Sequence, residues 1–456
     1  MSKRIIKKIA VLGSGVMGSR IALHFAGIGL QVLLLDIVPK DVSEKDPKAA
    51  RNKIVNDSLQ AALKSNPSPS YTKDVVKKVR TGNFEDNLQD IADCDWVIEV
   101  VVERLDIKQS LYEKVEKYRK PGTLITSNTS GIPISMLSQG RSEDFRKHFC
   151  GTHFFNPPRY LRLLEIIPTP ETDPAVIDFL MHYGDLYIGK TTVLAKDTPA
   201  FIANRIGVFG MMSIFGLVDK MDLTIDEVDA LTGPLIGRPK SATFRTADVV
   251  GIDTLVKVAK GVYEHCKEDE KKDVFQIPSW LNTVVENNWL GDKTGQGFFK
   301  KQKGSGGEKE IFTLNLKTLT YEPRQKPKFA SVDAAKPVDD LKQRLKMLVG
   351  AQDKAGEFLR HFHYGLFSYI SHRIPEISDE VYRIDDAMMA GFGWEIGAFE
   401  SWDVLGVEKT TKAMKEAGYE VAPWVDKMIA SGQTSFYKIE QGRTQSYDPA
   451  SGTYKT

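Results

Sequence analysis

The sequence predicts an α/β domain built on a parallel sheet, followed by two all-α domains that share one sequence pattern. Three observations support this fold class. A glycine-rich turn lies between two short apolar runs near the N-terminus, helical patterns dominate after residue 196, and one motif recurs with an offset of 155 residues. The length of 456 residues fits about three domains of ~150 residues each.

Composition and charge narrow the class of protein. Hydrophobic residues make up 41% of the chain and charged residues 27%, as in ordinary globular proteins. The net charge of +2 gives no reason to expect a nucleic acid partner. Cys94, Cys150 and Cys266 are too widely spaced to suggest a disulfide framework or a zinc site. No apolar run is long enough to span a bilayer, so we expect a cytoplasmic protein. The histidines other than His153 show no partner pattern, so we expect no bound metal.

The first expected strand, residues 9–12, leads directly into the spacing G-x-G-x-x-G. A short apolar run of this kind is typical of a buried parallel strand. Gly13 allows the tight turn, Gly15 lets the backbone approach a pyrophosphate, and Gly18 lets the next helix pack against the strand. Glycines that only form a turn are the alternative interpretation.

A helix over residues 16–26 and a second strand over residues 32–35 complete the nucleotide-binding pattern. The start of this helix, at Val16 and Met17, would offer free N–H groups to the phosphates. Asp36 ends the second strand, where a carboxylate accepts hydrogen bonds from ribose hydroxyls and repels a 2′-phosphate. The pattern therefore predicts a Rossmann domain that binds NAD rather than NADP.

Two further buried strands are expected within residues 95–103 and 122–130. Glu103 would end the first, and Asn128 and Ser130 lie in the polar turn after the second. Ligands of open α/β sheets bind beyond the carboxyl ends of the strands, so these side chains are expected on one functional edge. Taken singly, each could instead be a helix cap or a loop-end residue.

A long polar insertion occupies residues 37–80. Its Ala and Leu spacing suggests helices that break at "SNPSPS". This basic helical arm could touch an anionic substrate, although such a charge run is more often a solvated helix face.

The stretch "GTHFFNPPRYLRLLEIIP", residues 151–168, predicts two strands that carry His153 and Glu165 among apolar residues. Taken alone, it is explained by a histidine satisfied in the core and a carboxylate at a strand end. Because it follows a nucleotide-binding half and precedes the polar exceptions Asn204 and Arg205 in an apolar helix, we interpret the two groups as members of one site.

That apolar helix opens a second module, in which Asp197 or Thr198 is expected to cap the helix and Pro199 to lie in its first turn. Helical patterns continue to about residue 289 and close at "GDKTGQGFFKK". The later segment "FESWDVLGVEK" repeats the F-x3-D-x2-G spacing of "FRTADVVGIDT". We interpret the repeat as a duplicated helical domain whose second copy is structural and packs against the first.

The expected domains follow from these boundaries. They are an NAD-binding domain at 1–196, a helical domain at 197–300, a linker at 301–350, a second helical copy at 351–440 and a polar tail at 441–456.

The chain resembles the L-3-hydroxyacyl-CoA dehydrogenase family over essentially its whole length. The motifs that carry this resemblance, in order, are "GSGVMGS", "VVERLDIK", "SNTS", "GTHFFNPP", "LLEIIP", "KDTPAFIANRIG" and "KTGQGFF". The match is closest to the dehydrogenase portion of bacterial proteins fused to an enoyl-CoA hydratase. The resemblance implies NAD-dependent oxidation of (S)-3-hydroxyacyl-CoA to 3-oxoacyl-CoA in fatty-acid β-oxidation.

The resemblance also implies residue roles. His153 would be the catalytic base and Glu165 its carboxylate partner, with Ser130 and Asn204 completing the catalytic set. Contacts to the substrate are implied for Ser130, Asn204 and Asn156.

The nicotinamide half of the cofactor would be lined by Glu103, Lys108 and Asn128. The insertion after Asp36 falls where the family's acyl-CoA-contacting helices lie, so no residue contacts to CoA are carried over. The resemblance allows a homodimer and a fused or separate hydratase partner. Two alternatives stay open: a relative that acts on a small hydroxy acid or sugar acid, and a dinucleotide-binding scaffold without turnover.

Overall fold

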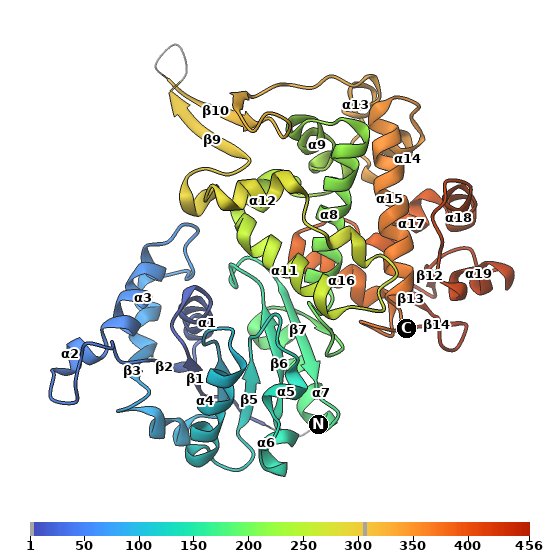
Figure 1. Ribbon diagram of the computed structural model, residues 1–456. Helices are drawn as coiled ribbons and strands as arrows, with labels where there is room; N and C mark the ends of the chain where they lie inside the picture. The colour runs from blue at the N-terminus through green and yellow to red at the C-terminus, as the bar shows by residue number, and fades with distance from the viewer. Residues whose placement is uncertain (1–3, 304–307) are drawn as a thin grey trace. The chain divides into compact units, whose positions relative to one another are not determined.

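The computed structural model describes residues 4–303 and 308–456. The chain divides into two compact units, Met1–Phe201 and Ile202–Thr456. The first unit is built around a sheet flanked by helices, and the second consists mainly of helices with two small sheets (Figure 1).

The first unit contains an eight-stranded sheet in the order β3-β2-β1-β4-β5-β6-β7-β8. The first six of its strands in chain order are parallel, as predicted, whereas β7 pairs antiparallel with β6, and β8 pairs parallel with β7. The strands are β1 (Lys8–Leu12), β2 (Gln31–Asp36), β3 (Val79–Asn83), β4 (Trp96–Glu99), β5 (Leu124–Ser127), β6 (Phe149–Phe154), β7 (Leu163–Pro168) and β8 (Thr191–Leu194).

Helices cover both faces of this sheet (Figure 1). On one face, Phe25 packs edge-on against Trp96 and Phe154, with ring centroids 5.3 and 6.0 Å apart. On the other, Tyr112 packs against Phe149 at 5.3 Å. The helices are α1 (Val16–Gly27), α2 (Lys48–Arg51), α3 (Lys53–Lys64), α4 (Leu105–Tyr118), α5 (Ile134–Leu137), α6 (Glu143–Lys147) and α7 (Pro174–Tyr183).

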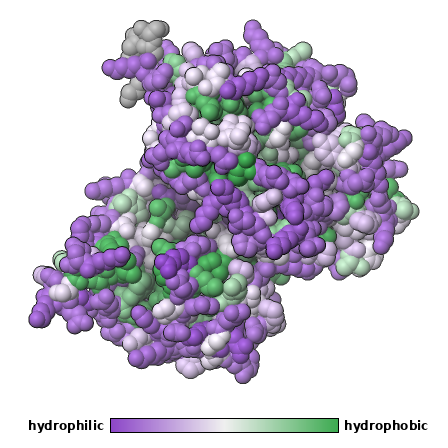
Figure 2. All heavy atoms as spheres, viewed as in Figure 1, coloured by the Kyte–Doolittle hydropathy of each residue, from purple (hydrophilic) through white to green (hydrophobic). Residues whose placement is uncertain are grey.

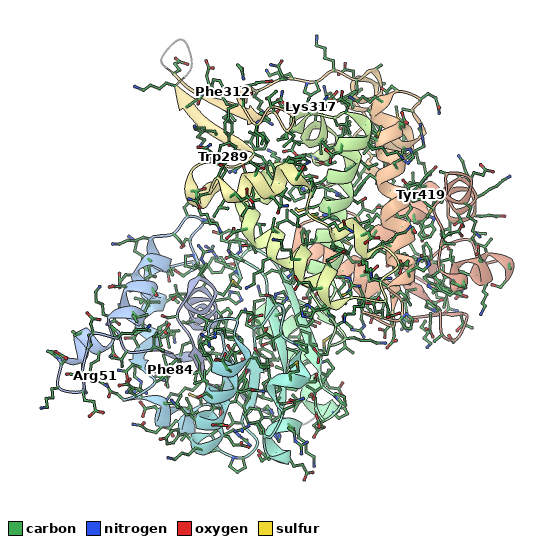
Figure 3. The ribbon with its side chains drawn as sticks, in the orientation of Figure 1. Arg51, Phe84, Trp289, Phe312, Lys317 and Tyr419 are labelled. Atoms are coloured by element: carbon green, nitrogen blue, oxygen red, sulfur yellow. The ribbon has the colours of Figure 1, made fainter. Side chains whose placement is uncertain are left out.

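The insertion between β2 and β3 forms α2 and α3, which confirms the prediction of helices that end before "SNPSPS". Arg51 of α2, labelled in Figure 3, is buried and donates two hydrogen bonds of 2.8 Å to Asp86, with a third of 3.0 Å to Glu85. These contacts attach the insertion to the loop after β3. At least one of its basic side chains, Arg51, therefore forms ion pairs within the domain and does not face a ligand.

Strand β4 is shorter than expected, because it ends at Glu99 rather than at Glu103. The backbone N–H of Val101 donates to the Glu99 carboxylate at 2.7 Å. A side chain thereby replaces a strand partner, and the chain turns away from the sheet before it reaches Glu103.

The helix expected to start near Asp197 or Thr198 begins later, as α8 (Ala203–Met221). Asp197 instead accepts hydrogen bonds from the N–H groups of Ile134 (2.7 Å) and Ser135 (2.9 Å), and so caps α5. Ala200 and Phe201 have left-handed backbone conformations, with φ of 64° and 50°, which a continuous helix does not permit.

The second unit alternates helices with two three-stranded sheets (Figure 1). Its helices are α8, α9 (Ile225–Leu231), α10 (Phe244–Val250), α11 (Ile252–His265), α12 (Ser279–Glu286), α13 (Ala330–Ala335), α14 (Leu341–Gly350), α15 (Lys354–His372), α16 (Val381–Phe392), α17 (Ala398–Leu405), α18 (Val407–Glu416) and α19 (Pro423–Ala430). Its strands are β9 (Phe299–Lys303), β10 (Lys309–Leu314), β11 (Tyr321–Pro323), β12 (Tyr437–Glu440), β13 (Arg443–Asp448) and β14 (Thr453–Lys455).

The two segments that share the F-x3-D-x2-G spacing have the same local geometry. Asp248 on α10 accepts backbone hydrogen bonds of 2.8 and 2.9 Å at the start of β9, from the N–H groups of Phe298 and Phe299. Asp403 on α17 accepts bonds of 2.7 and 2.9 Å from the N–H groups of Phe436 and Tyr437 at the start of β12.

The glycine of each motif follows its helix with a left-handed backbone. The φ angle is 103° at Gly251, between α10 and α11, and 86° at Gly406, between α17 and α18. A side chain would be strained at both positions, which explains why the motif keeps glycine there.

Two segments expected to be irregular contain regular structure. The predicted linker includes β10, β11, α13 and α14, although its glycine-rich part at 304–307 lies outside the described residues. The predicted polar tail forms β13 and β14, where Tyr447 is buried and stacks on Trp424 at 6.2 Å. Within the described parts of the chain, no helix is both long and apolar enough to cross a membrane. Figure 2 shows a mainly hydrophilic face with scattered hydrophobic patches.

Candidate active site

The carboxyl ends of the six parallel strands lie at one edge of the sheet and carry several of the predicted functional residues. The glycine loop follows β1, and Asp36 ends β2. Glu103 and Ser130 lie in the loops after β4 and β5, and His153 is the penultimate residue of β6. The fold therefore gathers these residues on the edge where α/β proteins bind ligands.

His153 and Glu165 face each other directly across the antiparallel pair of β6 and β7. Residues opposite each other in such a ladder have neighbouring side chains, and here His153 Nδ1 lies 2.7 Å from Glu165 Oε2. The side chains are almost completely buried, with 5% of His153 and 0% of Glu165 exposed. The structure therefore brings the two side chains into direct contact, whereas their membership of a catalytic site stays a prediction.

Two aromatic rings hold the His153 imidazole in place. The ring of Phe155 lies at 4.7 Å and that of Phe201 at 5.5 Å, both steeply inclined to the imidazole. Because Nδ1 faces a carboxylate that can only accept a hydrogen bond when ionised, the proton belongs on Nδ1 and the lone pair on Nε2.

Glu103 shapes the turn that carries Ser130. Its Oε1 atom accepts hydrogen bonds from the Thr129 hydroxyl (2.5 Å) and from the N–H groups of Ser130 (3.0 Å) and Gly131 (2.9 Å). Burial alone would raise the pKa of Glu103, but its ion pair with Lys108 and these hydrogen bonds hold the pKa below the usual value. The Ser130 side chain is exposed, and its hydroxyl has no hydrogen-bond partner within residues 4–303 and 308–456.

Lys108 lies inside the domain, with 1% of its surface exposed. Its Nζ atom is 2.7 Å from Glu99 Oε1 and 3.3 Å from Glu103 Oε2. Glu99 also accepts hydrogen bonds from the hydroxyls of Tyr112 (3.0 Å) and Ser127 (2.6 Å). Lys108 thus holds Glu103, and through Glu103 the turn that carries Ser130. Glu99 was not among the residues predicted from the sequence, although an acid at the end of a buried strand was a visible signal.

The two predicted asparagines of the first unit have different surroundings. Asn128 accepts a hydrogen bond of 2.9 Å from the Phe154 N–H, which ties the end of β5 to the end of β6. Asn156 is exposed and accepts a bond of 2.5 Å from Arg20 on α1. Asn128 therefore fixes the backbone beside His153, and Asn156 links the loop after β6 to the nucleotide-binding helix.

The three glycines of the loop after β1 differ in the space around them. A Cβ atom would lie 2.5 Å from the Val100 oxygen at Gly13, which also has a φ of 106°, and 1.8 Å from the Gly13 oxygen at Gly18. At Gly15 a Cβ atom would meet nothing within 4 Å. Gly13 and Gly18 are thus required by the fold itself, whereas the free space at Gly15 fits the close approach of a pyrophosphate.

Asp36 and the start of α1 complete the dinucleotide cradle. The Asp36 carboxylate accepts hydrogen bonds from the N–H (2.6 Å) and hydroxyl (2.5 Å) of Ser14, which fixes it beside the glycine loop. Val16 at the start of α1 is 65% exposed, so the N-terminal backbone of that helix is open to a ligand. A partly exposed carboxylate, a helix N-terminus and an open glycine fit NAD.

Asn204 belongs to the second unit, where it lies in the first turn of α8. The other predicted catalytic residues, Ser130, His153 and Glu165, belong to the first unit. Among the described residues, no group of three or more His, Cys, Asp or Glu side chains is arranged to hold a metal ion.

Two models of one family match consecutive parts of the chain. Residues 8–198 match the NAD binding domain of 3-hydroxyacyl-CoA dehydrogenase, and residues 201–301 match its C-terminal domain. The first range contains the glycine loop, Asp36 and the His153–Glu165 pair, and the second begins just before α8.

Three curated relatives support the same family. A probable 3-hydroxyacyl-CoA dehydrogenase of Bacillus subtilis is 44% identical over 97% of this chain and 56% of its own length. One from Deinococcus radiodurans is 46% identical over 65% of this chain and 84% of its own length. A putative fatty acid oxidation complex trifunctional enzyme of Rickettsia prowazekii is 33% identical over 97% of this chain and 58% of its own length. The chain thus spans little more than half of the two long relatives.

A solved structure has the same fold over nearly the whole chain. The 3-hydroxybutyryl-CoA dehydrogenase of Escherichia coli matches 94% of this chain and 99% of its own, with a TM-score of 0.67 and 21% identity. The chain belongs to the 3-hydroxyacyl-CoA dehydrogenase family and carries that family's NAD-binding domain.

Proposed function

We propose that the protein oxidises (S)-3-hydroxyacyl-CoA to 3-oxoacyl-CoA with NAD, as a step of fatty-acid oxidation. The observation that supports this most directly is the buried His153–Glu165 pair, with 2.7 Å between Nδ1 and Oε2, at the sheet edge that holds the dinucleotide cradle. Family membership and the names of the relatives agree with this reaction.

His153 would act as the general base. Its Nε2 lone pair takes the proton of the substrate's 3-hydroxyl group, while Nδ1–H stays bonded to Glu165. The imidazolium that forms is stabilised by the adjacent carboxylate, which also fixes the ring tautomer. A positioned base of this kind contributes roughly 10²–10⁴ to the rate. NAD⁺, when bound, supplies the acceptor for the hydride that leaves C3.

Substrate positioning is the role we assign to Ser130, Asn156 and Asn204. The family resemblance implies that the serine and the amide contact the substrate's oxygens, and the exposed Ser130 hydroxyl agrees with contact to a ligand. Glu103, which fixes the Ser130 turn, and Asn128, which fixes the end of β6, would hold the nicotinamide side of the site. Holding both reacting groups in place lowers the entropic part of the barrier.

We further propose that the second unit contains two copies of one helical domain. The shared motif has the same offset of 155 residues at all three positions. Asp248 and Asp403 each accept a backbone hydrogen bond at the start of the first strand of a three-stranded sheet. The second copy would be structural, because its aligned helix has His361 or a neighbour in place of Asn204. A hydratase, fused or separate, would be the partner activity, since the long relatives extend well beyond the matched region.

The test is a spectrophotometric assay of NADH oxidation with acetoacetyl-CoA, compared with free acetoacetate. We expect turnover with the thioester, little with the free acid, and a strong preference for NADH over NADPH because of Asp36. Equal turnover of the free acid would favour a small hydroxy acid substrate. NADH binding without turnover of either would favour the scaffold hypothesis, and equal use of NADPH would contradict the role of Asp36.

A further inference from the structure

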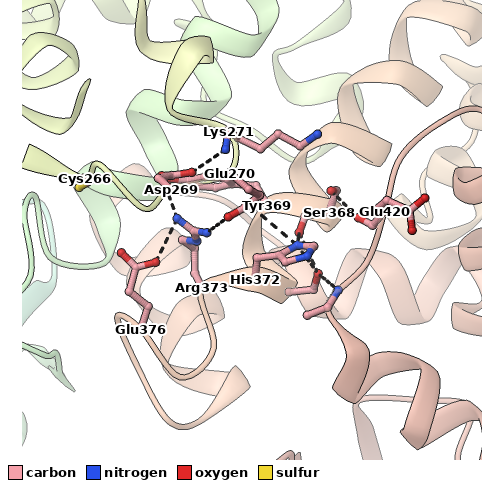
Figure 4. A network of polar contacts seen from close by, with 12 residues as sticks. Cys266, Asp269, Glu270, Lys271, Ser368, Tyr369, His372, Arg373, Glu376 and Glu420 are labelled. Carbon is pink, nitrogen blue, oxygen red and sulfur yellow. Dashed lines mark hydrogen bonds and ion pairs between the residues drawn. The ribbon is translucent and has the colours of Figure 1, made fainter. Parts of the chain in front are cut away.

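A network of polar contacts links Asp269, Tyr369, Arg373 and Glu376 (Figure 4). Arg205, in the first turn of α8, donates to Asp269 of this network. We propose that Tyr369, together with Asp269 and Glu376, positions Asn204 by fixing the first two turns of that helix. Tyr369 and Glu376 come from the part of the chain that we assign to the second helical copy, which would then have a role in catalysis. This inference rests on the proposed function, because Asn204 enters the reaction only through it.

Arg205, the neighbour of Asn204 on α8, is the centre of these contacts and is 0% exposed. Its Nε atom donates to the Tyr369 hydroxyl at 2.6 Å, and Nη2 donates to Asp269 at 2.7 Å and to Glu376 at 3.0 Å. A buried guanidinium is costly unless such partners surround it. Any shift of the first turn of α8 would therefore break charge-assisted hydrogen bonds of a buried guanidinium.

Tyr369 contacts α8 at two points one turn apart. Its hydroxyl bonds to Arg205, and its ring stacks in parallel on that of Phe209, with centroids 3.7 Å apart and an angle of 2°. Residues four apart lie on the same face of a helix. Two contacts along one face fix both the rotation of α8 about its axis and its position along that axis.

The Tyr369 hydroxyl is itself held from the other side, because it donates to Asp269 Oδ2 at 2.8 Å. Arg373, which is 2% exposed, lies 2.8 Å from the same carboxylate and 3.0 Å from Glu376. Burial alone would raise the pKa of Asp269, but Arg373 and the hydrogen bonds keep the pKa below its usual value. The carboxylate that orients Tyr369 therefore stays ionised at neutral pH.

A close approach of α16 adds a third contact. A Cβ atom at Gly207 would lie 2.2 Å from Cζ of Phe392, so the absence of a side chain lets that ring pack against the helix backbone. The first two turns of α8 are thus held by α15 through Tyr369 and by α16 through Phe392.

The consequence for catalysis follows from the stiffness of a helical turn. Because Asn204 and Arg205 are consecutive residues of the same turn, fixing the guanidinium fixes the direction of the Asn204 amide. A displacement of about 1 Å at a positioning group can cost roughly 10²-fold in rate.

Tyr369→Phe tests the proposal, since it removes the hydroxyl but keeps the ring that stacks on Phe209. We expect kcat with acetoacetyl-CoA and NADH to fall roughly 10- to 100-fold while the Kd for NADH stays unchanged. Tyr437→Phe is the matched control, because the Tyr437 hydroxyl also donates to a buried carboxylate, Asp385, at 2.9 Å, but this bond joins β12 to α16 and not to α8. Equal losses in both variants, or no loss in Tyr369→Phe, would overturn the proposal.

A double-mutant cycle with Asn204→Ala separates positioning from a general loss of packing. If Tyr369 acts through Asn204, then Tyr369→Phe adds no further loss of kcat in the Asn204→Ala background. A full, independent loss in that background would overturn the inference while leaving the proposed function intact. Failure of the proposed function itself would appear differently, as absence of turnover in the unmodified protein, and would overturn both.

Discussion

The absence of one side chain controls how closely a ligand can approach the loop after β1. Gly13 and Gly18 lack room for a Cβ atom because of the protein's own backbone, whereas Gly15 faces open space. The same residue type thus has a folding role at two positions and a binding role at the third. Substitution by alanine can separate these roles.

We expect Gly15→Ala to fold normally and to lose NADH affinity at least ~10-fold, because its methyl group would occupy space needed by the pyrophosphate. Gly27→Ala, at the end of α1 and also without close neighbours, is the matched control and should change neither property. Thermal unfolding and fluorescence titration with NADH measure both. Normal NADH binding by Gly15→Ala would show that the dinucleotide does not approach this backbone.

Glu165 is a second residue whose role a single substitution can test. In Glu165→Gln, the amide oxygen can still accept the hydrogen bond from His153 Nδ1, so we expect the fold to persist. The negative charge that stabilises the imidazolium is lost, and turnover of acetoacetyl-CoA should fall by roughly 10² or more. Circular dichroism and steady-state kinetics distinguish the outcomes: an unfolded variant would point to a core role, and unchanged turnover would contradict a catalytic one.

At the scale of elements, α1 is anchored near its C-terminal end by His24. The Nε2 atom of His24 lies 3.1 Å from the Ile188 carbonyl oxygen. Burial lowers the pKa of His24 to about 4, and the nearby positive charge of Lys190 acts in the same direction. The folded protein therefore keeps this histidine neutral at pH values where the unfolded chain protonates it.

This difference predicts an acid-labile contribution to stability. Because the folded pKa of His24 is about 4 and the ordinary histidine pKa is 6.5, its contribution is fully present above pH 6.5 and decreases as the pH falls towards 4. The loss amounts to about 3 kcal/mol in the free energy of unfolding. His24→Gln keeps an N–H donor for Ile188 without titrating, so urea unfolding at pH 7, 5 and 4 should show a smaller decrease.

His182, which is exposed on α7, provides the control for this measurement. His182→Gln should keep the pH dependence of the unmodified protein. If His24→Gln keeps it as well, the acid sensitivity arises elsewhere.

The sequence predicted the elements that carry strong local signals. The β1–α1–β2 unit has its glycines, helical spacing and terminal acid in one stretch, and the strands of residues 151–168 are apolar runs separated by a turn. The pairing of His153 with Glu165 was implied by the family resemblance, whereas local patterns do not encode the antiparallel register that brings the two residues opposite each other. The Glu99–Lys108 ion pair joins a strand end to a helix, so no single periodicity revealed it.

Element boundaries were predicted less well, because tertiary contacts decide them. Asp197 has the residue type of a helix cap and lies just before α8 in the sequence. It nevertheless caps α5, where it bonds to Ile134, 63 positions earlier in the chain. The C-terminal residues 441–456 are polar, yet they pair as strands around the buried Tyr447. In both cases the partner is distant in sequence, and composition alone favours the local interpretation.

At the scale of the whole molecule, the chain combines a nucleotide-binding unit with a helical unit that is larger than one family domain. The matching C-terminal model ends at residue 301, and the remaining residues contain α13–α19 and the last sheet. The contacts of Tyr369 and Phe392 with α8 give this additional part a physical connection to the first helical segment. Its presence is therefore expected to affect turnover as well as stability.

The most direct test of the central claim is the kcat of His153→Gln with acetoacetyl-CoA and NADH. His148→Gln is the matched control, because His148 also has a neighbouring carboxylate, with Nδ1 3.5 Å from Asp144 Oδ1, but lies away from the cofactor edge. We predict a decrease of at least ~10² in kcat for His153→Gln, with NADH affinity retained, and no comparable decrease for His148→Gln. Turnover of His153→Gln at the level of the unmodified protein would remove His153 from the mechanism and contradict the account.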